Sequence, residues 1–305
     1  MKICFIAPGE ISIPPSGWGA LETVVWNQSF HLNSLGVETL IINESCPQIT
    51  LQKIKNFNPD IVHLHYGKHW QIMPLLSCRK IVTNHDGSFK NSAIFHDNVV
   101  RKSLYDCEFF CLSEYEKNFF RSIGISPKKI KIMRNGVEFN KFKKNPAPIY
   151  NETICIGRID SRKQQSFLQK SKLKINFVGS VNCSDFDSHS LSYLGEWNRQ
   201  EIFNQITNYS NFILLSSSEN CCPLVCLEAM SSGLGIVISE ACTESIDLSL
   251  PFISVIPNDK IHNVEYISEV IQTNKEYSIT HRHEIIDYAE KRSWSNIAKE
   301  YLSNL

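Results

Sequence analysis

Short apolar runs alternate with amphipathic stretches along the whole chain. Several of the runs are continuous in apolar residues, which is typical of strands covered on both faces of a sheet. The expected strands are 2–7, 37–42, 60–65, 79–84, 108–113, 129–133, 153–157, 174–179, 192–195, 211–216, 235–239 and 252–256. Apolar residues recur at helical spacing in 21–35, 50–57, 113–124, 198–209, 223–232, 264–273 and about 283–304. This alternation predicts α/β domains with parallel sheets and right-handed crossovers.

The alternation of apolar and amphipathic segments is interrupted by the polar stretch KKNPAPIYNE at 143–152. Two prolines among polar residues, between periodic segments, indicate an interdomain linker. The length of 305 residues suits two domains, because domains of about 150 residues are common. We therefore expect two doubly wound Rossmann-like domains, 1–145 and 146–290, facing across a cleft, and ligands of such sheets bind beyond the carboxyl ends of the strands.

Composition and charge narrow the classes of partner. Lys+Arg and Asp+Glu both number 31, so no global basic field would attract nucleic acid, and an anion must be recognised locally. No apolar run approaches the roughly 18 residues of a membrane span, and the run in MKICFIAPGE is too short for a signal peptide. The eleven cysteines are scattered without a C-x-x-C pair. This spacing predicts neither disulfides nor a zinc knuckle, and it favours a reducing, cytoplasmic location.

Two cations follow the expected strand that ends in CIGRIDSRKQQ (155–165). Arg158 and Lys163 lie in the turn that leads into the next helix. Both can converge above the carboxyl edge of the sheet, where a diphosphate would need charge neutralisation. A solvated basic turn is the alternative, since such turns are common.

The stretch SENCCPLVCLEAMSSG (218–233) runs from a polar loop into a helix with a proline in its first turn and a glycine after its end. The amides of Leu224 and Val225 would face outward at the positive end of the helix dipole, where an anion can bind. Glu228 lies one turn further along, where its carboxylate could accept hydrogen bonds from a ribose. Glu219, in the preceding loop, could meet a sugar hydroxyl.

The same stretch raises the possibility of a thiolate metal site. Neighbouring Cys221 and Cys222 diverge, and Cys226 is not placed at C-x-x-C spacing, so no metal is expected. A cysteine nucleophile would need a partnered histidine, which the neighbouring sequence lacks. Apolar packing explains the thiols better. The one D-x-D run, Asp185–Asp187, falls in an expected loop and does not indicate a metal site.

The histidines of HLHYGKH (63–69) allow two interpretations. His63 and His65 point to the same side of the expected strand, but no third ligand stands at a fixed spacing, so hydrogen-bonded structure is favoured over a metal. Their place at the carboxyl edge of the first domain makes an acceptor pocket the more attractive functional role for His65. Trp18, with Tyr66 and Trp70, could stack on sugar rings there or could anchor loops.

Several segments together resemble the retaining family 4 glycosyltransferases. GRIDSRK followed by SENCCPLVCLEAMSSG is similar to the donor-binding half of that family, whose pattern is G-R-x4-K and then E-x7-E in a Glu-Ala-Met-x-x-Gly helix. Nearly the whole chain is covered in the right order, since further similar segments are PPSGWGALETVV (14–25), VTNHDGS (82–88), CLSEYEKNFF (111–120), KIMRNGVEFNKF (131–142) and KRSWSNIAKEYL (291–302). The resemblance implies the glycosyltransferase type-B fold, with a closing helix at about 291–305 that crosses back to the first domain.

The resemblance also implies roles for single residues. The catalytic set would be His85, Arg158, Lys163 and Glu219. The donor-binding set would be Gly19, Arg158, Lys163, Glu219, Asn220, Cys222, Pro223, Leu224, Val225 and Glu228. The first domain would bind the acceptor, with His65 and Trp18 on that side, and His85 would donate to a hydroxyl of the reacting sugar or support its developing charge.

Two residues depart from the family pattern. Glu219 stands one position early, which gives E-x8-E, and Asn220 occupies the position of the family's first glutamate. A one-residue bulge would let Glu219 reach the sugar, whereas without it Asn220 would take that place, and Glu219 is slightly favoured. Ala20 replaces a second loop glycine, which leaves slightly less room for a phosphate.

The expected function is transfer of a hexose, with retention, from a donor of the GDP-mannose or UDP-glucose type. The acceptor would be a hydroxyl of a glycan, glycoprotein or glycolipid, and neither a metal nor another cofactor is expected. A non-catalytic nucleotide-sugar or glycan-binding protein of the same fold, or a nucleotide-sugar epimerase, is the alternative. A nicotinamide-dependent dehydrogenase is disfavoured because no G-x-G-x-x-G follows a strand. The base, the sugar, the acceptor and the oligomeric state are left open.

Overall fold

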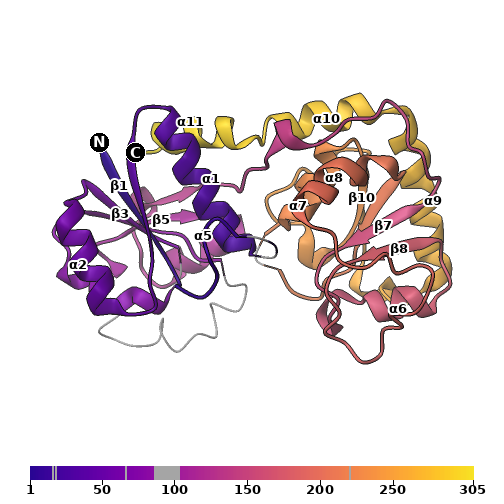
Figure 1. The fold of residues 1–305 in the computed structure, drawn as a ribbon, viewed down its shortest axis with the longest axis horizontal. Helices are drawn as coiled ribbons and strands as arrows, with labels where there is room; N and C mark the ends of the chain where they lie inside the picture. The colour runs from indigo at the N-terminus through magenta and orange to yellow at the C-terminus, as the bar shows by residue number, and fades with distance from the viewer. Residues whose placement is uncertain (16, 18, 66, 86–103, 220) are drawn as a thin grey trace. The chain divides into compact units, whose positions relative to one another are not determined.

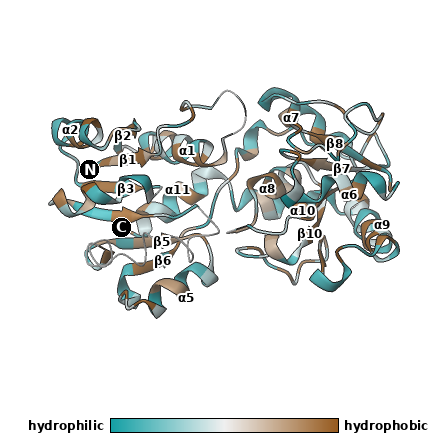
Figure 2. Ribbon diagram, turned by 90° about the horizontal axis from the view of Figure 1, so that it is seen from below, coloured by the Kyte–Doolittle hydropathy of each residue, from teal (hydrophilic) through white to brown (hydrophobic). Residues whose placement is uncertain are grey.

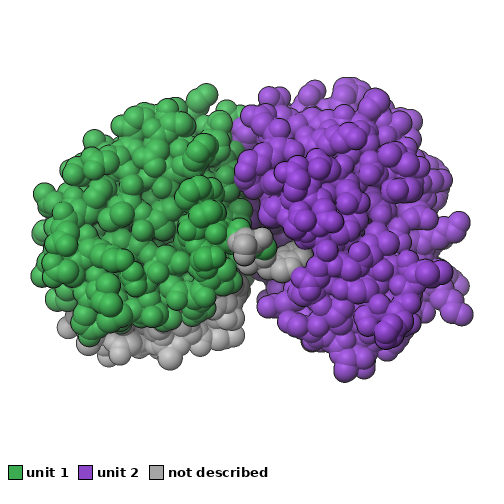
Figure 3. All heavy atoms as spheres, viewed as in Figure 1, with its two compact units in different colours: residues 1–136, 294–305 green, residues 137–293 purple. Residues whose placement is uncertain are grey.

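A computed structural model describes residues 1–15, 17, 19–65, 67–85, 104–219 and 221–305 (Figure 1). The chain divides into two compact units. Unit 1 comprises residues 1–136 and 294–305, and unit 2 comprises residues 137–293, as coloured in Figure 3. Each unit is built around its own parallel sheet.

Unit 1 contains a six-stranded parallel sheet in the order β2-β1-β3-β4-β5-β6 within the described residues. Its strands are β1 (Lys2–Ala7), β2 (Glu38–Asn43), β3 (Ile61–Leu64), β4 (Arg79–Val82), β5 (Glu108–Cys111) and β6 (Ile130–Ile132). The helices are α1 (Ala20–Ser34), α2 (Pro47–Phe57), α5 (Glu114–Ser122) and α11 (Trp294–Ser303), with 3-10 turns η1 (Gly67–Leu75) and η3 (Pro127–Lys129). The strand residues are largely apolar, as Figure 2 shows for β1 and β3, and form the buried core.

Unit 2 has five parallel strands in the order β11-β10-β9-β7-β8 within the described residues. They are β7 (Thr153–Ile156), β8 (Ile175–Val178), β9 (Asn211–Leu214), β10 (Gly235–Ser239) and β11 (Ile253–Ile256). The helices are α6 (Gln165–Lys170), α7 (Arg199–Gln205), α8 (Leu224–Ser231), α9 (Val264–Thr280) and α10 (Arg282–Glu290), with 3-10 turns η4 (Phe139–Lys141), η5 (Ser161–Lys163), η6 (Ile206–Asn208), η7 (Glu240–Cys242) and η8 (Asn258–Lys260). None of the helices in the described ranges combines the length and the apolarity that crossing a membrane requires.

The order of strands in unit 2 creates a topological switch point. The chain leaves β7 for β8 on one side and later returns through β9 on the other side of β7. Ligands of open parallel sheets bind outside the carboxyl ends of the two strands at which the order reverses. The loops after β7 and β9 are therefore the places to look for a ligand site in this unit.

The unit boundary lies at 136/137, nine residues before the expected 145/146. Phe139 and Phe142 are buried in the core of unit 2, and the stretch expected to be a linker packs against the same unit. The main-chain N–H of Lys143 donates to the Phe203 carbonyl at 2.8 Å, and the Arg282 Nε donates to the Asn145 carbonyl at 3.0 Å. Composition could not indicate this, since the contacts use backbone groups that every sequence carries.

Two expected elements differ from the structure. Segment 192–195 is not a strand and forms only an isolated bridge between Phe177 and Tyr193. The expected helix at about 283–304 is two helices, α10 and α11, because Ser293 forms a bridge with Val137. The Arg292 carbonyl accepts from the Val137 N–H at 2.9 Å, so this short segment leaves the helical path between the two helices.

The closing helix α11 completes unit 1, as expected. Trp294 and Tyr301 are buried, and the indole of Trp294 packs directly over Gly136. A Cβ at position 136 would lie 2.7 Å from the Trp294 ring, so only glycine leaves room for this contact. The Tyr301 hydroxyl lies 3.0 Å from Nδ1 of His63 on β3, which ties the helix to the sheet.

Candidate functional site

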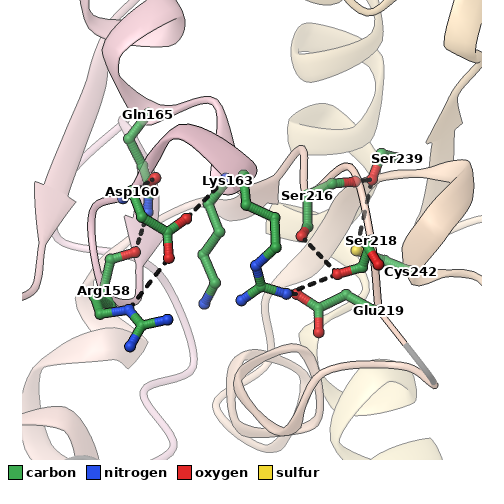
Figure 4. A network of polar contacts seen from close by, with 10 residues as sticks. Arg158, Asp160, Lys163, Gln165, Ser216, Ser218, Glu219, Ser239 and Cys242 are labelled. Carbon is green, nitrogen blue, oxygen red and sulfur yellow. Dashed lines mark hydrogen bonds and ion pairs between the residues drawn. The ribbon is translucent and has the colours of Figure 1, made fainter. Parts of the chain in front are cut away.

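The turn after β7 carries the two predicted cations. Gly157 adopts a φ of 150°, and a Cβ there would lie 2.8 Å from the Lys163 Nζ. The Lys163 side chain thus lies back across the end of β7, in the space that a glycine leaves open. Figure 4 shows that the Arg158 and Lys163 side chains extend to the same side of the turn. The structure therefore brings these two cations together at the carboxyl edge of the sheet.

Asp160 and Gln165 fix the shape of this turn. One carboxylate oxygen of Asp160 accepts from the Lys163 N–H at 3.1 Å, and the other accepts from the Arg158 Nε at 3.2 Å. The buried Gln165 side chain donates to the Arg158 carbonyl at 3.0 Å. The turn is therefore held by its own side chains.

The loop after β9 is hydrogen-bonded to the same turn. The Arg162 Nη1 donates to a Glu219 carboxylate oxygen at 2.9 Å and to the Ser218 carbonyl at 2.7 Å. Glu219 therefore lies beside the cationic turn, with its carboxylate paired to Arg162, while Asn220 lies outside the described residues. Arg162 has no distinguishing signal in the sequence, because it falls within the spacer of the R-x4-K pattern.

Helix α8 begins just after this loop. Pro223 is the N-cap and Leu224 is the first helical residue, so the proline stands one position outside the expected first turn. The main-chain N–H groups of Leu224 and Val225 have no hydrogen-bond acceptor among the described residues, as is usual for the first turn of a helix. Together with the dipole of α8, these amides can bind an anion.

Glu228, in the second turn of α8, is held in a buried ion-pair network. Its carboxylate accepts from the Arg199 Nη1 at 2.7 Å, and the Arg199 Nη2 donates to Glu138 at 3.1 Å. Burial lowers the pKa of Arg199, but the two carboxylates outweigh this effect and raise it. Neither Arg199 nor Glu138 was singled out from the sequence, where no pattern links positions so far apart.

Two of the three cysteines of 218–233 pack in the core of unit 2, and Cys221 is half-buried. Cys222 and Cys226 are buried among apolar side chains, in agreement with the interpretation of these two thiols as small apolar residues. Burial raises the pKa of Cys242, which lies in the same core, to about 12, so this thiol is poorly suited to act as a nucleophile. Among the described residues, no group of three His, Cys, Asp or Glu side chains could hold a metal ion.

The candidate residues of unit 1 are Gly19, His65 and His85, whereas Trp18 lies outside the described residues. Gly19 is the N-cap of α1 and adopts a φ of 159°. His65 Nδ1 lies 3.1 Å from His85 Nε2, so one ring donates to the other. The His65 Nε2 is buried without a partner among the described residues. Burial lowers the pKa of His85 to about 4, so its imidazole is neutral at pH 7.

His63 is part of the hydrogen-bond network that holds α11. Thr83 Oγ1 donates to the Phe110 carbonyl at 2.9 Å, so it accepts from the His63 Nε2 at 2.9 Å. The Nδ1 of His63 is then unprotonated and accepts from the Tyr301 hydroxyl. Burial holds the pKa of His63 well below its ordinary value, with His85 as a smaller cause. This histidine is structural, as the favoured interpretation of the 63–69 stretch predicted.

Acidification is expected to destabilise unit 1. The folded-state pKa values of His63, His65 and His85 are lowered, so between about pH 6.5 and 4 the unfolded chain binds more protons. Stability therefore falls as the pH drops through this window. His63→Gln should reduce the slope by at most about 1.4 kcal/mol per pH unit. Urea unfolding at several pH values measures this, with the exposed His283→Gln as control, and an unchanged slope in His63→Gln would contradict it.

Several known proteins are similar to this chain in sequence or in fold. Residues 45–141 match the model of Glycosyltransferase Family 4. A capsular polysaccharide biosynthesis glycosyltransferase, CapH of Staphylococcus aureus, is 26% identical over 174 residues, which are 50% of this chain and 49% of that protein. The match thus spans about half the length of this curated relative.

Solved structures match the whole chain. Sucrose-phosphate synthase from Thermosynechococcus elongatus superposes with a TM-score of 0.76 at 12% identity, over 99% of this chain and 97% of that one. HepE from Anabaena, solved in complex with UDP-glucose, superposes with a TM-score of 0.73 at 14% identity, over 100% of both chains. The expected similarity to family 4 glycosyltransferases and the type-B fold are both confirmed.

Proposed function

We propose that this chain, which has the glycosyltransferase type-B fold, transfers a hexose from a nucleotide-diphosphate sugar to an acceptor hydroxyl. The observation that carries the proposal is the convergence of the Arg158–Lys163 turn and the loop before α8 at the switch point of unit 2. HepE, which has a similar fold, was solved in complex with UDP-glucose. The name of CapH supports an acceptor in polysaccharide synthesis.

The leaving group of such a reaction is a nucleotide diphosphate, which gains negative charge as the glycosidic bond breaks. Arg158, Lys163 and the amides of Leu224 and Val225 would stabilise this charge. Asp160 holds the Arg158 side chain and the Lys163 main chain, which would limit the reorganisation needed during the reaction. With this much fixed positive charge, we propose that the reaction requires no metal.

Glu228 would bind the ribose of the donor. Its Oε1 accepts a hydrogen bond from Arg199, and its Oε2 has no hydrogen-bond partner among the described residues. A carboxylate oxygen can accept hydrogen bonds from the vicinal hydroxyls of a ribose. Arg199 would keep the carboxylate charged and pointed in one direction.

We propose that unit 1 binds the acceptor, with His65 and Trp18 on that side and Gly19 near the donor phosphates. His85 would donate a hydrogen bond to a sugar hydroxyl. Its lowered pKa of about 4 favours this role over that of a positive charge at neutral pH. Retention at the anomeric carbon is part of the proposal and follows from the family resemblance.

A panel of nucleotide sugars tests the proposal. A donor of the GDP-mannose or UDP-glucose type should raise the unfolding temperature, since about 2.7 kcal/mol is gained at a concentration 100 times Kd. With an acceptor present, release of the nucleotide diphosphate should follow and should persist in the presence of a chelator. Stabilisation without release, with every acceptor tried, would favour a binding protein. A changed sugar without acceptor would indicate an epimerase, and no stabilisation by any donor would overturn the proposal.

A further inference from the structure

Arg162 connects the two loops of the switch point in three places. Its carbonyl accepts from the Ser217 N–H at 2.8 Å. Its Nη1 donates to the Ser218 carbonyl at 2.7 Å and to the Glu219 carboxylate at 2.9 Å. Three consecutive residues of the loop after β9 are thus held by one residue of the turn after β7, and Figure 4 shows the contacts to Ser218 and Glu219.

The Arg162–Glu219 pair contributes little to the stability of unit 2. The side chains are 38% and 18% exposed, and an ion pair at this exposure is worth about 0–1 kcal/mol. The ion pair itself is therefore not needed to hold the fold together. Its effect is to fix the direction of one carboxylate and the path of one loop.

The pair also distinguishes Arg162 from the two cations beside it. Arg162 and Arg158 are each paired with a carboxylate, Glu219 and Asp160 respectively, but the two pairs differ in where the partner lies. The Arg158 Nε contacts only the carboxylate of Asp160, within its own turn, among the described residues. Arg162 instead reaches across to the neighbouring strand's loop.

The contact fixes where the carboxylate of Glu219 lies. Glu219 stands nine residues before Glu228, and Arg162 holds its carboxylate against the turn. Its Oε1 is paired, and the Oε2 has no hydrogen-bond partner among the described residues. We propose that Arg162 is a positioning residue that presents Glu219 to the sugar of the donor. This inference rests on the proposed function.

Comparing a nucleotide sugar with its nucleotide diphosphate isolates this role. Calorimetry on Arg162→Met should show about tenfold weaker binding of the nucleotide sugar, as expected for a lost hydrogen bond of about 1.4 kcal/mol. Binding of the diphosphate alone should stay within about twofold of the parent, because the phosphate-binding groups are intact. Arg162→Lys keeps the charge and should recover part of the affinity for the sugar.

The double variant tests whether Arg162 acts through Glu219. Glu219→Gln should weaken nucleotide-sugar binding, and Arg162→Met should add little in the Glu219→Gln background, since one interaction is lost only once. Additive losses would overturn the inference. So would equal weakening of the sugar and the diphosphate, which would make Arg162 a phosphate ligand, or no change in either. If the parent binds no nucleotide diphosphate at all, the proposed function itself fails.

Discussion

Replacing Arg158 or Lys163 by alanine is expected to lower turnover roughly 100- to 1,000-fold, the usual cost of removing a preorganised group that stabilises a developing negative charge. Each variant loses one of the two cations that face the same side of the turn after β7. The fold should survive, because the Arg158 side chain is 57% exposed and Lys163 is not part of the core. Release of nucleotide diphosphate, measured with a donor and an acceptor, gives the rate.

Lys170→Ala provides a matched control for this experiment. Lys170 is an exposed cation at the end of α6, close in sequence to the turn but outside it. Its removal changes the net charge by the same amount and should leave turnover within about twofold of the parent, since an exposed charge in water is well screened. Equal turnover in the parent, Arg158→Ala and Lys163→Ala would contradict the assignment of the diphosphate site.

Arg199→Met is expected to destabilise unit 2 by roughly 3 kcal/mol and to weaken nucleotide binding. The side chains of Glu228 and Glu138 are only 9% and 10% exposed, and removing one partner of a buried ion pair leaves charge uncompensated at a cost of about 3–5 kcal/mol. We expect a loss at the low end of this range, because the Arg199 side chain is 27% exposed and Lys141 still pairs with Glu138. Urea unfolding and calorimetry with a nucleotide diphosphate measure the two effects.

Two further variants test why Arg199→Met should lower the stability of unit 2. Arg121→Met removes an exposed arginine of α5 and should change stability by less than about 0.5 kcal/mol. Adding Glu228→Gln to Arg199→Met should recover part of the stability, because the buried carboxylate that lost its partner becomes neutral. If Arg199→Met unfolds at the same urea concentration as the parent, the network does not hold Glu228.

Much of the fold could be predicted from the sequence because the strands of a parallel sheet are covered on both faces. Runs such as KICFIA and NFILLS are continuous in apolar residues, and the structure places β1 and β9 within them. Segment 192–195 contains only two large apolar side chains, Tyr193 and Leu194, and the bridge it forms is too short for a strand. The break between α10 and α11 arises from pairing with Val137, a contact that lies far away in the chain.

The candidate site could be predicted in part for a similar reason. Arg158, Lys163 and the start of α8 lie within ten residues of the end of a strand, so local sequence indicates where they lie. The residues that orient the carboxylates come from elsewhere: Arg162 is 57 residues from Glu219, and Arg199 is 29 residues from Glu228. An arginine that reaches a distant carboxylate has no local signature, since its flexible side chain suits many partners.

Because α11 follows all of unit 2 in the chain, the ribosome makes this part of unit 1 only after it has made unit 2. Until Tyr301 emerges, Phe5, Phe110 and His63 in the sheet of unit 1 lack the contacts that this side chain makes with them. Unit 2 is contiguous and can fold as soon as residue 293 is free. Because unit 2 lies between the two segments of unit 1 in the chain, unit 2 can complete its folding before unit 1 does. A chain interrupted after unit 2 would leave exposed the apolar surface of unit 1 that α11 covers.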